Sequence, residues 1–179
     1  MARVLAIANQ KGGVGKTTTS VNLAASLAAM NQRVLLVDLD PQGNATMGSG
    51  VDKHAVERSI YHVLVNRAPV PLITQRVPEG GFDVLPANDD LTAAEVELIG
   101  VDHRERRLSS ALREVDSKYD YILIDCPPSL NMLTLNGLVA AHGVLIAMQC
   151  EYFALEGLSA LVNTINRVAD SVNPRLQIE

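Results

Sequence analysis

Residues suited to binding phosphate and a divalent cation stand together near the start of the chain, where positions 10–18 read Gln-Lys-Gly-Gly-Val-Gly-Lys-Thr-Thr. The three glycines of this segment lack a Cβ, so the backbone can take left-handed angles and point successive N–H groups at one anion. The ammonium of Lys16 supplies positive charge for β- and γ-phosphates, and the hydroxyl of Thr17 suits Mg²⁺. The segment therefore predicts a loop that binds the phosphates of a nucleotide.

The segments on either side of this loop have the composition that a phosphate loop requires. Residues 3–8 are apolar and partly β-branched, which predicts a buried strand. Residues 19–29 are rich in alanine and leucine, which predicts a helix that begins near Lys16. A phosphate loop is credible only between a strand and a helix. The alternative is a glycine-rich turn without a ligand, but that gives no structural reason for Gly-Lys-Thr at this joint.

Two later apolar segments end in carboxylates. Residues 32–38 predict a strand that ends at Asp38 and is followed by Asp40 in a turn with Pro and Gly. Residues 119–125 predict a strand that ends at Asp125. Ligands of α/β sheets bind at the carboxyl ends of the strands, and Asp125 stands where a Walker B carboxylate reaches the Mg²⁺ shell. The turn after Asp38 is either solvated or a switch that senses the γ-phosphate.

The composition indicates a single α/β domain over residues 1–179. Hydrophobic residues make up 47% of the chain, aromatic residues only 3%, and there is no Trp. A core of Leu, Ile, Val and Ala is typical of a buried parallel sheet covered by helices. Sequence patterns predict further strands at 82–86 and 143–148 and one beginning at 175, with helices at 59–65, 88–95, 108–115 and 155–168. We expect a doubly wound, mainly parallel sheet with helices on both faces.

Several classes of protein do not fit the sequence. No apolar run approaches the roughly 20 residues of a membrane span, and no signal peptide precedes the first predicted strand. Cys126 and Cys150 are too few and too far apart for a disulfide framework or a metal knuckle. The four histidines show no spacing typical of a metal site. These features favour a reduced, cytoplasmic setting.

The charge distribution does not mark the whole chain as a nucleic-acid binder. The formal net charge is −5, which gives no general attraction to a phosphate backbone. Arginines do cluster on or beside the helix predicted at 108–115, namely Arg104, Arg106, Arg107 and Arg113. They either contact a phosphate backbone or form a solvated helix face balanced by neighbouring acids, and we expect the solvated face.

The first lysine of the loop narrows the class of phosphate-binding protein to which the chain is compared. Gln10 occupies the first glycine position of the ordinary G-x-x-x-x-G-K-[ST] pattern, and Lys11 follows it. The run from Lys11 to Thr18 resembles the deviant Walker A box of the ParA/MinD ATPases, whose signature is that lysine. Residues 38–44 and 126–131 resemble the two switch segments of the family, and residues 149–158 resemble the chromosomal ParA (Soj) branch.

The resemblance implies a nucleotide site for ATP and Mg²⁺. The residues implied to bind the nucleotide are Lys11, Gly12, Gly13, Val14, Gly15, Lys16, Thr17 and Thr18. Thr17 would bind the metal directly and Asp125 mostly through water, while Asp40 would position the attacking water and Asp38 would support the site. Lys11 would act in trans, reaching the phosphates of the partner in a nucleotide-sandwich homodimer. The catalytic residues implied are thus Lys11, Lys16 and Asp40.

The resemblance also implies a biological role. Members of this branch are ATPases of chromosome or plasmid partitioning, so we expect an ATP-dependent dimer that binds DNA without sequence preference on the nucleoid. A ParB-type centromere-binding protein would stimulate hydrolysis, and no membrane contact is expected. Family members continue beyond the segment that corresponds to residue 179, so we expect this chain to lack the C-terminal elements that carry part of the adenine pocket and most DNA-binding residues.

Three alternatives remain open at this point. A MinD-like membrane-associated ATPase of cell-division-site placement shares the loop but anchors through a C-terminal amphipathic helix. An electron carrier like the nitrogenase iron protein also shares the loop, but Cys126 and Cys150 do not match its cluster-binding pattern. A non-catalytic fragment that binds nucleotide poorly is the third alternative.

Overall fold

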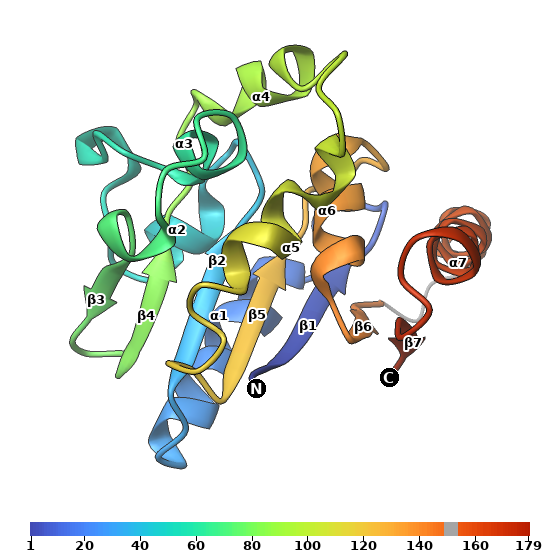
Figure 1. Cartoon of the computed structure of the whole chain (residues 1–179). Coiled ribbons are helices and arrows are strands. Elements are labelled where there is room, and N and C mark those ends of the chain that lie inside the picture. The colour runs from blue at the N-terminus through green and yellow to red at the C-terminus, as the bar shows by residue number, and fades with distance from the viewer. Residues whose placement is uncertain (149–153) are drawn as a thin grey trace.

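The computed structural model describes residues 1–148 and 154–179, and for residues 154–156 the backbone only. The described residues form one seven-stranded sheet in the order β3-β4-β2-β5-β1-β6-β7 (Figure 1). Its strands are β1 (Arg3–Ala8), β2 (Val34–Asp38), β3 (Gln75–Val77), β4 (Phe82–Leu85), β5 (Tyr121–Asp125), β6 (Gly143–Ile146) and β7 (Gln177–Ile178). All neighbouring strands are parallel except β3, which pairs antiparallel with β4. The predicted, mainly parallel sheet is confirmed.

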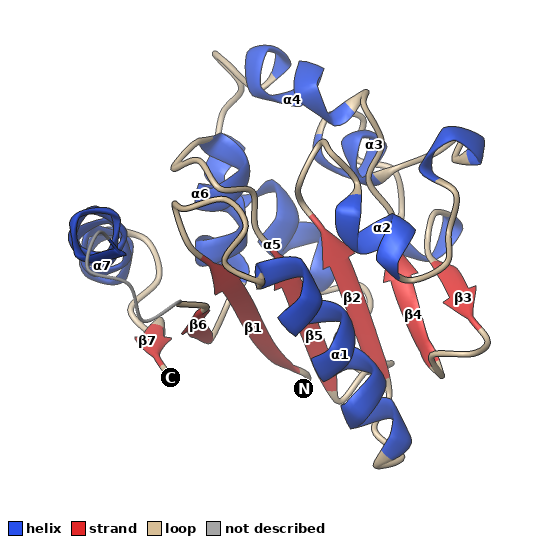
Figure 2. Ribbon diagram, turned by 180° about the vertical axis from the view of Figure 1, so that it is seen from behind, coloured by secondary structure: helices blue, strands red, loops and turns tan. Residues whose placement is uncertain are grey.

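Helices cover both faces of the sheet (Figure 2). The helix α1 lies on one face, whereas α3, α5 and α6 lie on the other (Figures 1 and 2). The α-helices are α1 (Lys16–Ala29), α2 (Asn44–Gly48), α3 (Ile60–Leu64), α4 (Leu91–Glu97), α5 (Arg107–Leu112), α6 (Met132–Ala140) and α7 (Ala154–Ser171), with short 3₁₀ turns η1 (Lys53–Ala55), η2 (Val70–Leu72) and η3 (Arg104–Arg106). None of the helices in the described ranges is long and apolar enough to cross a bilayer.

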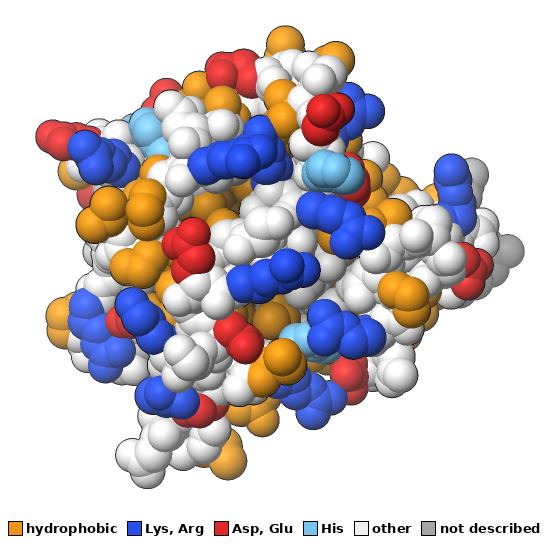
Figure 3. Space-filling model, in the orientation of Figure 1, with side chains coloured by type: hydrophobic (Ala, Val, Ile, Leu, Met, Phe, Trp, Pro, Cys, Tyr) orange, Lys and Arg blue, Asp and Glu red, His pale blue; other side chains and the backbone are white. Residues whose placement is uncertain are grey.

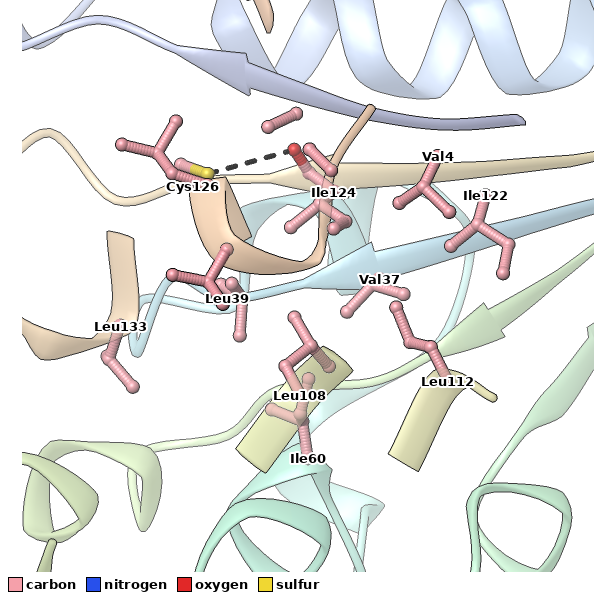
Figure 4. Close-up of a cluster of buried hydrophobic side chains, with 14 of the residues drawn as sticks. Val4, Val37, Leu39, Ile60, Leu108, Leu112, Ile122, Ile124, Cys126 and Leu133 are labelled. Carbon is pink, nitrogen blue, oxygen red and sulfur yellow. Dashed lines mark hydrogen bonds between the residues drawn. The ribbon is translucent and has the colours of Figure 1, made fainter. Parts of the chain in front are cut away.

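Each face of the sheet has its own hydrophobic core. Side chains of β2 and β5 such as Val37 and Ile122 point toward Ile60 of α3 and Leu108 of α5 (Figure 4). On the opposite face, Ala24 of α1 packs with residues of β1, β2, β4 and β5. Because both faces are buried, the central strands are apolar along nearly their whole length, as expected of a parallel sheet.

Most predicted helices and strands are confirmed, although some begin or end a few residues away from the predicted positions. β5 begins at Tyr121 rather than at residue 119. Asp120 instead uses both carboxylate oxygens to accept hydrogen bonds from Arg33, and the Tyr119 hydroxyl donates to Asp83 at 2.8 Å. α4 begins only at Leu91, after two aspartates that precede its first turn. The segment 149–158, which carried the resemblance to the chromosomal branch, lies largely outside the described residues.

The carboxyl ends of the strands meet along one edge of the sheet. β5 lies between β1 and β2, so the phosphate loop after β1 is adjacent to the end of β5. In the β2–β5 register Asp38 is opposite Asp125, and in the β1–β5 register Ile7 is opposite Asp125. The fold therefore brings the three segments predicted to carry chemistry to one place.

Candidate nucleotide-binding site

The loop between β1 and α1 has the conformation that its glycines permit. Gly13 and Gly15 have φ values of 74° and 86°, and Gly15 is the N-cap of α1. A Cβ added at Gly12, Gly13 or Gly15 would meet no atom within 4 Å, so the loop faces open space on this side. Backbone N–H groups at the start of a helix can therefore be approached closely by an anion.

The two lysines of the loop have different environments. Lys16 is 7% exposed, and its Nζ donates to the carbonyl oxygen of Lys11 at 3.2 Å, which holds the ammonium against the loop. Lys11 itself is exposed, and its backbone N–H donates to Asn9 Oδ1 at 2.9 Å. The Asn9 side chain also donates to the carbonyl oxygen of Ala147, which fixes the loop to the end of β6. Of the other predicted contact residues, Val14 is buried and Thr18 is exposed.

Thr17 and Asp125, the two predicted metal ligands, are in contact. Thr17 Oγ1 donates to Asp125 Oδ2 at 2.8 Å, and Ser20 Oγ donates to Asp125 Oδ1 at 2.7 Å. Burial raises the pKa of Asp125, and the two hydroxyl hydrogen bonds oppose that shift. Sequence reasoning missed Ser20, although its spacing of three residues from Thr17 places both hydroxyls on the same face of α1.

Asp38 organises the turn that follows β2. Its side chain is completely buried and accepts hydrogen bonds from Thr46 N at 2.8 Å, Thr46 Oγ1 at 2.7 Å and Asp40 N at 3.1 Å. Burial raises the pKa of Asp38 to about 7, and the nearby charge of Asp125 adds to the shift. Thr46 Oγ1 also accepts a hydrogen bond from Ala87 N at 2.9 Å. Thr46 connects this turn to the segment after β4, and no local pattern in the sequence marks it for this role.

Asp40 is only partly buried at the same edge. Its Oδ1 accepts a hydrogen bond from Gln42 N at 2.9 Å. Its charge contributes to raising the pKa of Asp125, so the two carboxylates are close enough to interact. The turn ends at Gly43, whose φ of 65° is in the left-handed region. The structure thus brings Asp40 to the same edge as Asp125 and Thr17.

The segment after β5 runs from the site to α6. Cys126 is 1% exposed and lies in the hydrophobic core, as predicted for a small packed residue, and burial raises the pKa of its thiol. Asn131 caps α6 by accepting a hydrogen bond from Thr134 N at 3.1 Å. The Asn131 side chain also donates to Glu95 of α4. This second predicted switch segment is therefore fixed at its far end by α4.

The arrangement suits a nucleotide with a hard divalent cation. The open glycine loop and Lys16 match phosphate oxygens, while Thr17 and Asp125 offer oxygen ligands of the type that Mg²⁺ prefers. The described residues contain no cluster of three or more His, Cys, Asp or Glu side chains that could hold a metal alone. Mg²⁺ usually needs only one or two protein carboxylates, because phosphates and water complete its shell.

Known proteins resemble this chain along its whole length. The sequence pattern of the family described as AAA domain matches residues 2–178. The chromosome partitioning protein ParA of Myxococcus xanthus is 54% identical over 100% of this chain and 63% of its own length. The sporulation initiation inhibitor protein Soj of Bacillus subtilis is 54% identical over 100% of this chain and 71% of its own length.

Solved structures share the fold. A structure described as cobyrinic acid a,c-diamide synthase from Mycobacterium smegmatis, with bound ADP and magnesium, has a TM-score of 0.96 and 46% identity to this chain. The match covers 99% of this chain and 72% of that one. With the matching family pattern, the curated relatives and the phosphate loop between β1 and α1, these likenesses lead to one conclusion: the chain belongs to the ParA/Soj family of P-loop ATPases.

Proposed function

We propose that this protein is a Mg²⁺-dependent ATPase that partitions chromosomal or plasmid DNA. The observation that carries the proposal is the contact of Thr17 with Asp125 beneath a glycine loop that begins with Lys11. This is the geometry required to hold a nucleoside triphosphate with its metal. The names of the two curated relatives, ParA and Soj, support the assignment to partitioning.

Each side chain of the site has a distinct role in the proposed reaction. The loop N–H groups and Lys16 would hold the β- and γ-phosphates of ATP, and Thr17 and Asp125 would hold the metal, Thr17 directly and Asp125 mostly through water. When bound, Mg²⁺ neutralises charge on these phosphates. Asp40 orients the water that attacks the γ-phosphorus in line, and ADP leaves with its β-oxygen neutralised by Lys16. Positioning and charge stabilisation are most of what phosphoryl transfer needs.

Lys11 is the residue that connects hydrolysis to assembly in this proposal. It is exposed at the start of the loop, while Lys16 is buried against it. In the proposed homodimer Lys11 contacts the phosphates held by a second copy of the chain, and ATP bridges the two copies. The dimer binds DNA without sequence preference on the nucleoid, in the cytoplasm, and a ParB-type protein stimulates hydrolysis and release. Residues 1–179 act as one domain of this protein.

The decisive experiment compares Asp40→Ala with Lys11→Ala in the full protein. We expect Asp40→Ala to bind Mg²⁺–ATP, hydrolyse it far more slowly and accumulate as a dimer in sedimentation. Lys11→Ala should stay monomeric with ATP, and only the dimer should bind random-sequence DNA with an affinity that falls steeply with salt. Monomers throughout, or a dimer indifferent to ATP and DNA, would refute the partitioning role.

Two other functions are separated by further measurements. A MinD-like ATPase would bind anionic lipid vesicles when ATP is present, whereas we expect no vesicle binding. The Mycobacterium smegmatis neighbour is described as a cobyrinic acid a,c-diamide synthase, so ATP-dependent amidation of cobyrinic acid should be assayed as well. We favour partitioning because the relatives named ParA and Soj are 54% identical, against 46% for that neighbour.

A further inference from the structure

A cavity lies on the face of the sheet that carries α3 and α5, and it includes no residue of the phosphate loop. Its volume is about 780 Å³, which falls in the range of about 300–1,000 Å³ typical of small-molecule sites. Its walls come from the end of α3, the turn before η3, and α5. No residue of the phosphate loop, of the turn after β2 or of the end of β5 lines it. The cavity is therefore separate from the proposed ATP site.

Four arginines line this cavity, against three acidic residues. Figure 3 shows Lys and Arg side chains gathered across the middle of this face, over α3 and α5. The arginines that line the cavity are Arg67, Arg106, Arg107 and Arg113. Arg106 is already engaged, with Glu105 at 3.6 Å and with the carbonyl oxygen of Val172 at 3.4 Å. Within the described part of the chain, the guanidinium groups of Arg67, Arg107 and Arg113 make no ion pair or hydrogen bond.

Arg107 departs most from the solvated helix face that the sequence predicts. It is half-buried, and its Nε and Nη1 atoms are buried with no hydrogen-bond partner among the described residues. Burial and the neighbouring charge of Arg67 lower the pKa of Arg107. Two guanidinium nitrogens that are buried without a hydrogen-bond partner and lie near a second cation are costly, since their removal from water is not compensated. An anion in the cavity would relieve both costs.

The backbone around the cavity is held in an unusual conformation at two places. Arg67 and His103, which both line the cavity, have φ values of 56° and 55°, in the left-handed region that residues with a Cβ rarely adopt. Such strain persists only where the surrounding structure imposes it, and it concentrates at ligand sites. The acids Asp102 and Glu114 at the cavity are exposed to water, as are Arg67 and Arg113, so among the described residues here only Arg107 has buried polar atoms without a partner. The buried polar side-chain atoms at the cavity that lack a partner within the described ranges are Nε and Nη1 of Arg107, and both are hydrogen-bond donors.

We propose that this cavity is a binding site for a phosphate dianion, free or as the terminal group of a small phosphomonoester, held by Arg67, Arg107 and Arg113. Guanidinium groups match the geometry of phosphate oxygens and can donate two parallel hydrogen bonds to them. The cavity has room for the phosphate and for the small molecule that carries it. Binding there would be independent of the nucleotide at the loop after β1.

The test measures binding of inorganic phosphate by calorimetry to the full protein and to three variants. We expect Arg107→Gln to weaken binding about tenfold or more, because hydrogen bonds to charged groups are strong. The matched control Arg104→Gln removes a neighbouring arginine that does not line the cavity, and it should bind as the parent does. Lys16→Ala removes the phosphate contact of the nucleotide loop and should leave this binding intact. Equal binding by Arg107→Gln, or loss of binding in Lys16→Ala, would overturn the proposal.

Two further readouts distinguish a binding role from a structural one and phosphate from DNA. In chloride buffer Arg107→Gln should melt at the same temperature as the parent or higher, because it removes an unpartnered buried guanidinium. In a Lys16→Ala background, which removes phosphate binding at the nucleotide loop, added phosphate should raise the melting temperature of the single variant but not of the double variant that also carries Arg107→Gln. A variant that melts lower in chloride and still responds to phosphate contradicts the assignment. The proposal also fails if Arg107→Gln weakens binding of a random-sequence duplex while binding of inorganic phosphate is unchanged.

Discussion

Ser20 donates a 2.7 Å hydrogen bond from its Oγ to Asp125 Oδ1 in the interior of the protein, where the two residues are 0% and 1% exposed. Thr17 binds the other oxygen of the same carboxylate at 2.8 Å. The carboxylate at the end of β5 is thereby fixed in orientation from one side by α1. Under the proposed function Ser20 is a positioning residue for Asp125, and Thr17 is the hydroxyl proposed to bind the metal.

We expect Ser20→Ala to weaken Mg²⁺–ATP binding by about 10- to 100-fold, the usual effect of losing a partner that orients a metal-binding group. The measurement is a titration of Mg²⁺ at fixed nucleotide, with a fluorescent ATP analogue as the reporter. Ser26→Ala is the matched control, since Ser26 lies on the exposed side of the same helix. If both variants bind as the parent does, Ser20 has no positioning role.

Lys16→Ala should lose nucleotide affinity by at least about tenfold, because it deletes the one buried ammonium at the glycine loop among the described residues. Equilibrium binding of Mg²⁺–ATP measures this directly. Lys118→Ala changes an exposed lysine far from the loop and provides the comparison. Tight binding by Lys16→Ala would mean that the phosphates are bound elsewhere.

Asp38 should make the stability of the nucleotide-free, metal-free protein depend on pH. Its pKa rises from 3.8 to about 7 on folding, so between these values the folded state binds more protons than the unfolded state. The free energy of unfolding must therefore fall as pH rises through this window, by up to about 1.4 kcal/mol per pH unit. Asp38→Asn mimics the neutral side chain and should flatten this slope.

Urea unfolding at a series of pH values in the presence of EDTA measures the slope for Asp38→Asn and its parent. Asp89→Asn, which changes an exposed carboxylate, serves as the control and should keep the parental slope. An unchanged slope in Asp38→Asn would show that another group binds the proton.

Gly43→Ala should lower the free energy of unfolding by more than Gly50→Ala does. Both glycines have left-handed φ values, 65° and 84°, so each substitution adds strain of about 1–2 kcal/mol. Only at Gly43 would the new Cβ also meet neighbours, at 2.8 Å from Lys53 Cδ and 3.2 Å from the carbonyl oxygen of Ala87. Denaturant titration of the two variants gives the difference, and equal losses would mean that the contacts at Gly43 relax without cost.

The phosphate loop and the strand that carries Asp125 could be predicted from the sequence because each is encoded by a continuous stretch of residues. The strand, the glycine loop and the helix are contiguous in the sequence. The apolar run before Asp125 marks a buried strand, and the carboxyl end of such a strand lies at the ligand-binding edge of a parallel sheet. Ser20 could have been found from its helical spacing to Thr17. Thr46 could not, because its contact with Ala87 joins residues 41 positions apart and depends on how β2 and β4 pair.

Arg107 shows a second limit of sequence reasoning. Its neighbours Glu105, Glu114 and Asp116 favour the interpretation of a solvated, charge-balanced helix face. In the structure α5 packs against α3 and α6, so part of this face is turned inward and the Nε and Nη1 atoms of the half-buried Arg107 are shielded from water. The partners of a helix decide which of its polar residues are buried, and those partners are distant in sequence.

The hydrogen bonds of Thr46 and Asn131 connect two parts of the site edge to the same stretch of chain after β4. Asp38 connects through Thr46 to Ala87, just after β4, and Asn131 connects α6 to Glu95 of α4. Ala87 and Glu95 belong to one short stretch of chain, because α4 begins at Leu91. The turn after Asp38 and the start of α6 are therefore held to the same stretch of chain, and neither can move away from it without breaking one of these hydrogen bonds.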